Sequence, residues 1–274
     1  MDFDDALSRE QEEKVKDIVE TGTDIAGATT GAAIGLLVGG PPGALAGAAA
    51  GPAAARTLRG LAVEFRERVL GYREEVRVGA AISFASAKIK EKLENGEQPR
   101  QDDFFTDAED DRATAKEVFE GVVLAAQREA EEKKVRLYGN LLANLAFAQN
   151  VDRSQANFLL KLSEDLSYRQ LCLLSLFAQN TLLGENNPFN LRTSSYSQDA
   201  DSVSFEFELV ALLQEIYGLY QRGIVSNGGT AMVAVADANP SQMSPVGAAV
   251  NLYNLMELWT VSVDDLNALI LLLR

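Results

Sequence analysis

The chain has 274 residues, with 25 lysines and arginines against 40 aspartates and glutamates, which gives a net charge of −15 at pH 7. Such an acidic surface repels nucleic acid and anionic membranes wherever no local basic patch compensates. Histidine is absent and cysteine occurs once, so the commonest general base, the commonest metal ligand and any internal disulfide are excluded.

The first residues, "MDFDDALSREQEEKVKD", are acidic, unlike the basic start of a secretory signal or a transit peptide. Ser8 and Gln11 have the spacing of a capping box, which predicts a helix that begins there and continues into the glycine-rich segment that follows. Because the first residues are acidic, we expect the protein to be in the cytoplasm at first.

A glycine occurs at every fourth position of "GATTGAAIGLLVGGPPGALAGAAAG", and residues 25–55 contain no charge. Pro41 and Pro42 interrupt the helical pattern, because neither has an N–H donor and each disfavours a helical residue before it. The pattern predicts a helical hairpin with arms at 25–39 and 43–55. A spacing of four places the glycines of one arm on a single stripe, where two helix backbones can approach closely. These glycines are Gly27, Gly31, Gly35, Gly39, Gly43, Gly47 and Gly51.

Each arm would be roughly 20–23 Å long, shorter than the about 30 Å that a membrane-spanning helix must cross. Three interpretations stay open: a close-packed element of a helical bundle, a segment that enters a membrane on a trigger, and a contact between copies of the chain. Basic residues that follow the second arm suit anionic headgroups, or else form a solvated face that pairs with neighbouring glutamates. They are Arg56, Arg59, Arg66 and Arg68.

Apolar residues recur at helical spacing from Leu58 to Ala80, which predicts a helix to about residue 94. The stretch from Arg56 to Glu94 has nine basic and six acidic residues, a net charge of +3. Residues 95–111, "NGEQPRQDDFFTDAEDD", combine turn residues with acidic ones and predict a solvated linker. The expected domains are therefore 1–94, with the hairpin and a long helix, and 112–274.

The second domain is expected to begin with one long helix over residues 112–150. Asp152 with Gln155 caps a short helix to Leu162, and Ser163 caps another to about Gln179. Cys172 lies in an apolar helical run and is expected to be a core residue.

The last part of the chain is acidic, with five basic and twelve acidic residues from Gln155 onward. It also contains short strand patterns in addition to helical ones. "SFEFELVALLQEIYGLYQRG" predicts a helix, and "IVS" and "TAMVAVA" predict two strands around "NGG". Ser244 and Pro245 are expected to begin a helix to about Leu258, and Ser262 with Asp265 the last helix. This order is typical of a winged-helix-like module.

The helix of this module that would enter a DNA groove, residues 244–259, has no basic residue, so DNA binding is not expected. Aromatic residues indicate either a protein-binding surface or a core cluster. They are Tyr217, Tyr220, Tyr253 and Trp259.

Two short runs and one longer pattern are similar to a known family. The runs are "LLAN", Leu141–Asn144, and a Leu-Ser pair followed by two acids, Leu162–Asp165. The pattern is "LQEIYGLYQRGIV … MSPVGAAVNLYNLMEL". From Lys133 onward, over about half its length, the chain resembles the Abi-alpha family of bacterial proteins associated with abortive infection. The resemblance implies antiphage or stress-related growth arrest, without an established active site.

The expected fold is mainly α-helical: a glycine-zipper hairpin and a helical bundle, with a winged-helix-like module that contains a small β-hairpin. The expected function is that of a non-enzymatic antiphage defence effector whose hairpin perturbs the inner membrane. The alternative is a soluble helical adaptor or scaffold whose hairpin mediates oligomerisation. We expect no cofactor, no metal and no nucleic acid. The expected partners are a membrane, a protein or further copies of the chain, with association at the inner membrane on activation.

Overall fold

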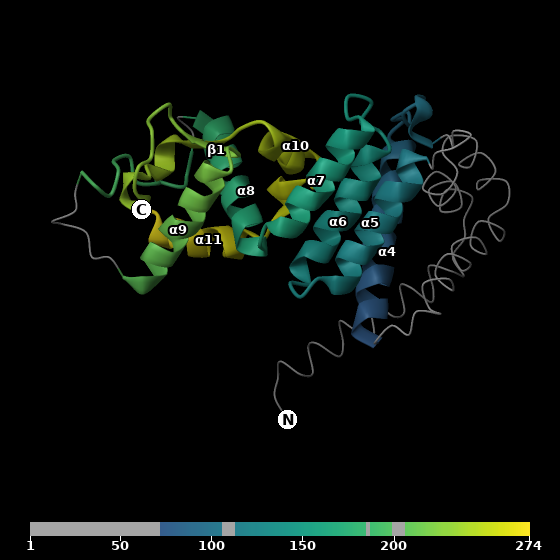
Figure 1. Ribbon diagram of the computed structural model, residues 1–274, viewed down its shortest axis with the longest axis horizontal. Coiled ribbons are helices and arrows are strands. Elements are labelled where there is room, and N and C mark those ends of the chain that lie inside the picture. Colours follow the sequence, from purple (N-terminus) through teal and green to yellow (C-terminus); the bar gives the residue numbers. More distant parts are fainter. Residues whose placement is uncertain (1–71, 106–112, 185–186, 199–205) are drawn as a thin grey trace. The chain divides into compact units, whose positions relative to one another are not determined.

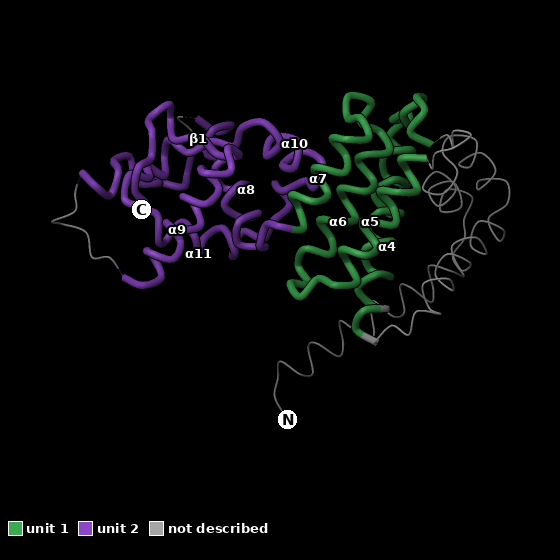
Figure 2. The backbone as a smooth tube through the Cα atoms, in the orientation of Figure 1, with its two compact units in different colours: residues 1–164 green, residues 165–274 purple. Residues whose placement is uncertain are grey.

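The computed structural model describes residues 72–105, 113–184, 187–198 and 206–274. They belong to two compact units, the first ending at Glu164 and the second beginning at Asp165 (Figure 1, Figure 2). The described part contains eight α-helices and one two-stranded antiparallel sheet, which confirms the mainly helical fold with a small β element. Among these helices, none is both long and apolar enough to cross a membrane. The expected glycine hairpin and the helix predicted from Ser8 lie outside the described residues.

The first unit contains four described α-helices and one short 3-10 helix. They are α4 (Tyr72–Glu94), η1 (Asp103–Phe105), α5 (Thr114–Arg128), α6 (Lys133–Leu145) and α7 (Arg153–Asp165). Helices α4, α5 and α6 pack against one another (Figure 1). Helix α7 joins α5 through Arg153, whose Nε donates to Glu117 at 2.8 Å. The unit is thus a bundle held by both apolar and charged contacts.

Helices α4 and α6 approach each other closely at Gly139. A Cβ atom at Gly139 would lie 2.7 Å from the carbonyl oxygen of Ala81 and 2.7 Å from Cβ of Phe84. Ala81 and Ala85 on α4 are fully buried, so α4 has small side chains where it meets Gly139. Glycine at this position therefore allows two helix backbones to touch, which a larger residue would prevent.

The single long helix expected over residues 112–150 is wrong, because the chain breaks between α5 and α6. Glu129, which ends α5, has an extended backbone (φ −68°, ψ 124°), and its carboxylate accepts a hydrogen bond from the N–H of Glu131 at 2.9 Å. The cap predicted for α7 is confirmed. The N–H of Gln155 donates to Oδ1 of Asp152 at 2.8 Å, and the N–H of Asp152 donates to Oε1 of Gln155 at 3.1 Å.

The segment expected to be a linker, residues 95–111, is described up to Phe105, and this part is held within the first unit. The N–H of Arg100 donates to the carbonyl oxygen of Ala146 at 3.0 Å. The Arg100 side chain is buried, pairs with Asp102 and lies 4.2 Å from the ring centroid of Phe104. The compact units divide between Glu164 and Asp165.

The second unit is built around a buried helix, α8 (Tyr168–Leu183), which contacts the other helices and the sheet. Residues Leu171–Ala178 are all buried, and Cys172 is confirmed as a core residue. Strands β1 and β2 pair antiparallel, with Ser226 opposite Ser244. The other elements are α9 (Phe207–Gln221), β1 (Val225–Asn227), η3 (Val235–Asp237), η4 (Pro240–Gln242), β2 (Met243–Pro245), α10 (Ala248–Leu255), η5 (Leu258–Thr260) and α11 (Val263–Leu272).

The helix start predicted at Ser163 is wrong. Ser163 is buried inside α7 and its hydroxyl donates to the carbonyl oxygen of Leu160 at 2.7 Å, so it is satisfied within the helix and does not end it. Helix α8 instead begins after Ser167, which forms a capping box with Gln170. The cap predicted at Ser262 is confirmed, since its hydroxyl accepts from the N–H of Asp264 at 3.3 Å.

The second strand predicted at residues 230–236 is also wrong. The carboxylate of Asp237 accepts hydrogen bonds from the N–H groups of Val233 at 2.9 Å and Ala234 at 2.8 Å, which turns the chain into η3. The strand that pairs with β1 is Met243–Pro245. Ser244 and Pro245 therefore lie in β2 and do not begin a helix, and α10 starts at Ala248.

Candidate functional site

Every site residue predicted from the sequence lies outside the described residues. These are the seven glycines Gly27, Gly31, Gly35, Gly39, Gly43, Gly47 and Gly51, the turn residues Pro41 and Pro42, and the basic residues Arg56, Arg59, Arg66 and Arg68. In the part of the chain that the structure describes, no three residues among histidine, cysteine, aspartate and glutamate come together as metal ligands.

The first unit contains a buried charged cluster that the sequence did not predict, here called the Lys134 cluster. It consists of Glu129, Lys134, Tyr138 and the backbone carbonyl of Glu164. Lys134 and Tyr138 are four residues apart on α6, which places them on one face of the helix. Glu129 ends α5, and Glu164 lies in the last turn of α7. Three helices therefore supply the cluster.

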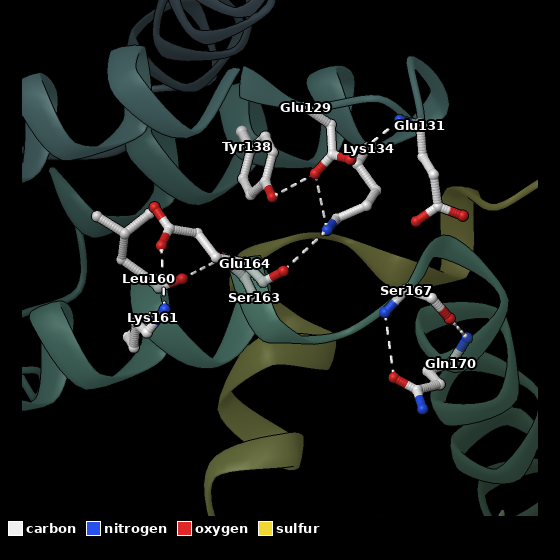
Figure 3. Close-up of polar contacts among 10 residues, drawn as sticks. All are labelled: Glu129, Glu131, Lys134, Tyr138, Leu160, Lys161, Ser163, Glu164, Ser167 and Gln170. Atoms are coloured by element: carbon white, nitrogen blue, oxygen red, sulfur yellow. Dashed lines mark hydrogen bonds and ion pairs between the residues drawn. The ribbon is translucent and has the colours of Figure 1, made fainter. Parts of the chain in front are cut away.

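The geometry of the Lys134 cluster satisfies its buried polar atoms (Figure 3). Nζ of Lys134 lies 2.8 Å from Oε2 of Glu129, donates to the carbonyl oxygen of Glu164 at 3.3 Å, and lies 5.4 Å from the ring centroid of Tyr138. The Tyr138 hydroxyl donates to the same Oε2 atom of Glu129 at 2.8 Å. The Lys134 side chain is only 3% exposed and that of Glu129 12%, so water contributes little to their solvation.

Burial and hydrogen bonding act in opposite directions on Glu129. Burial alone would raise the pKa of its carboxyl. Hydrogen bonds from Lys134, the Glu131 N–H and Tyr138, with the charge of Lys134, outweigh burial and hold this pKa below its ordinary value. The pKa of Tyr138 is raised far above its ordinary value, first by burial and then by the Glu129 carboxylate. Glu129 is therefore a charged acceptor and Tyr138 a neutral donor, an arrangement that fastens the α5–α6 turn to the end of α7.

In the part of the first unit that the structure describes, Lys134 and two arginines each reach the carbonyl end of a helix from another segment of the chain. Nη2 of Arg77 donates to the carbonyl oxygen of Gln127 in α5 at 2.8 Å. Nη1 of Arg100 donates to the carbonyl oxygen of Leu145 in α6 at 3.4 Å. Nζ of Lys134 donates to the carbonyl oxygen of Glu164 in α7. The last carbonyl groups of a helix have no partner inside it, and the helix dipole makes that end negative. Each cation thus stabilises a helix end supplied by a different part of the chain.

The second unit presents aromatic residues of two kinds. Tyr253 is buried, and its ring makes an edge-to-face contact with Trp259 at 5.5 Å between centroids, whereas Trp259 itself is 47% exposed. Tyr217 and Tyr220 stack at 6.4 Å, and the Tyr217 hydroxyl donates to the carbonyl oxygen of Val233 at 3.1 Å. Tyr253 therefore belongs to the core, whereas Trp259 lies at the surface, and a protein-binding role for these aromatic residues stays a prediction.

The Lys134 cluster was missed because Lys134 stands in "EAEEKKVR", where it resembles any solvated charge on a helix. One local signal was present. Tyr138 lies among apolar residues at helical spacing on its helix, and a lysine four residues earlier shares that side. Comparison of the chain with protein-family models, with curated proteins and with solved structures finds no match. The likeness to the Abi-alpha family therefore stays a prediction.

The lowered pKa of Glu129 predicts a loss of stability in acid. In the unfolded chain this carboxyl takes its ordinary pKa of 4.5, and in the folded protein its pKa is lower. Its contribution is therefore fully present above the unfolded value and is lost as the pH falls through the folded value. We expect Glu129→Gln to flatten the decline of the unfolding free energy between about pH 5 and pH 3, measured by urea unfolding.

The matched control for this prediction is Glu132→Gln, which removes an exposed glutamate of the same turn and should leave the decline as it is in the parent protein. Equal slopes for the parent and Glu129→Gln proteins would contradict the assignment.

Proposed function

We propose that the chain is a bacterial antiphage effector of the abortive-infection type, which acts without catalysis by perturbing the inner membrane through its glycine-rich segment. The observation that supports this proposal is the run of seven glycines at every fourth residue between 27 and 51, within a stretch that contains no charge. A glycine inside a helix costs about 1 kcal/mol relative to alanine, so such a repeat has to be offset by close helix contact. Contacts of this kind are frequent between membrane helices.

The defence role rests on the resemblance of residues from Lys133 onward to the Abi-alpha family. The two short runs that resemble the family, Leu141–Asn144 and Leu162–Asp165, belong to α6 and to the end of α7. In this proposal the second unit, with its helix, two strands and helix in the order of a winged-helix-like module, binds a protein partner and restrains the glycine-rich segment. Trp259 is an exposed aromatic residue of the kind that suits such a contact.

The direct test is the membrane potential of bacteria that express the protein, followed with a voltage-sensitive dye. We expect the parent chain to depolarise the cells and the Gly35→Leu/Gly39→Leu variant to leave the potential unchanged, because leucine blocks close helix approach on the glycine stripe. The Gly35→Ala/Gly39→Ala variant is the matched control. It keeps small side chains and should retain most of the effect. Depolarisation by the leucine variant at equal expression would contradict the proposal.

A second candidate is a soluble helical adaptor whose glycine-rich segment joins copies of the chain. The specific observation in its favour is the contact at Gly139, where this chain uses glycine to bring two helices of a bundle together. Cell fractionation with light scattering separates the two candidates. An adaptor should stay in the soluble fraction as an oligomer, and the leucine variant should lower its mass.

A further inference from the structure

The connection between α7 and α8 is short and is bounded by a separate cap on each side. Helix α7 ends at Asp165 and α8 begins at Tyr168. On the α8 side, the N–H of Gln170 donates to Oγ of Ser167 at 3.2 Å, and the N–H of Ser167 donates to Oε1 of Gln170 at 3.1 Å (Figure 3). The start of α8 therefore has a cap made by two residues of the second unit.

On the α7 side, the cap comes from a distant residue. The Glu164 carbonyl is one of the last carbonyl groups of α7, for which the helix itself provides no N–H donor. It accepts a hydrogen bond from the buried ammonium of Lys134, thirty residues earlier. The Glu164 side chain points to another partner, Lys161, at 3.6 Å on the surface. The backbone and the side chain of one residue thus contact two different lysines, one buried and one 66% exposed.

We propose that Lys134 acts as a latch on the last turn of α7. The ammonium contacts both the Glu164 carbonyl at the end of this helix and the Glu129 carboxylate at the α5–α6 turn, and so holds the two together. The residue held in this way is the last one of the first unit. Loss of the ammonium opens the last turn of α7 locally, while α8 keeps its own cap. The surface pair of Lys161 with Glu164 contributes little, because exposed ion pairs are weak. This inference is independent of the proposed function.

The test is amide hydrogen exchange of the full chain, read by mass spectrometry or NMR. The variant is Glu129→Gln/Lys134→Met, because removing Lys134 alone would leave the Glu129 carboxylate buried without its cation. We expect the amides of residues 162–165 to exchange about 10- to 100-fold faster than in the parent, the factor of one charge-assisted hydrogen bond. Amides in the middle of α6 should change by a smaller factor, and those of α8 not at all.

The matched control is Lys161→Met, which removes the exposed lysine that contacts the same glutamate and should leave the exchange of residues 162–165 unchanged. Two results would overturn the proposal. One is unchanged exchange at the end of α7 in the double variant. The other is the same acceleration in α6 as at the end of α7, since Lys134 would then support the unit as a whole and not its last turn.

Discussion

Replacement of Gly139 by alanine is expected to lower the free energy of unfolding of the first unit by about 3 kcal/mol. The added Cβ would lie 2.7 Å from the carbonyl oxygen of Ala81 and 2.7 Å from Cβ of Phe84. Both atoms belong to or adjoin the α4 backbone and cannot rotate away, so α4 and α6 must move apart and lose contact along their length. Urea unfolding followed by far-UV circular dichroism measures the change.

Two other helical glycines provide matched controls. At Gly218, in the last turn of α9, an added Cβ would meet no atom within 4 Å. Gly218→Ala should therefore raise the free energy of unfolding by up to about 1 kcal/mol, the difference in helix propensity. At Gly121 the nearest atom is a terminal methyl of Leu160, which can turn aside, so Gly121→Ala should cost less than Gly139→Ala. If all three substitutions behaved alike, the close contact of α4 with α6 would be contradicted.

Local sequence patterns predicted those parts of the fold that local interactions determine. The caps at Asp152 and Ser262 depend on residues within a few positions of each other, and both are confirmed. The break between α5 and α6 was missed because "QREAEEKKVR" consists largely of good helix formers and contains no glycine or proline. Contacts of Glu129 with Lys134 and Tyr138 support the break, and these become visible only when the helices are packed.

The second strand was misplaced for a related reason. Residues 230–236 have the composition of a strand, but Asp237 binds two backbone N–H groups of this segment and turns it. The true partner of β1 includes Pro245, a residue that counts against a strand in sequence-based prediction. In the pair, Val225 lies opposite Pro245 and β2 packs on α8, a contact between distant segments that no local pattern encodes.

The glycine repeat and the Lys134 cluster also differ in how far the local sequence predicts them. The glycine repeat is periodic along the chain and is therefore evident without a structure. The Lys134 cluster combines groups from the ends of α5 and α7 with one face of α6, and its buried contact spans thirty residues. A charged residue in a charged stretch gives no local sign that it is buried, so this cluster had to be found from the packing.

Replacement of Lys134 by methionine is expected to lower the free energy of unfolding of the first unit by about 3–5 kcal/mol. Methionine keeps the apolar stem against Tyr138 but leaves the Glu129 carboxylate, only 12% exposed, without its cation. Removing one charge of a buried pair destabilises a protein more than replacing both, because the remaining charge stays buried without a partner. The expected loss for Lys134→Met therefore comes mainly from the Glu129 carboxylate. Lys133→Met, at the exposed neighbouring position, is the control and should change the free energy by less than about 1 kcal/mol.

The double variant Glu129→Gln/Lys134→Met should therefore be more stable than Lys134→Met alone, although it differs from the parent at one more position. Glutamine can still accept hydrogen bonds from Tyr138 and from the Glu131 N–H, and it carries no charge that needs a cation. A double-mutant cycle from urea unfolding at pH 7 gives the interaction energy directly. Additive effects of the two substitutions would show that Glu129 and Lys134 are not coupled. A double variant more stable than either single one would show that each charge is costly when it is buried without the other.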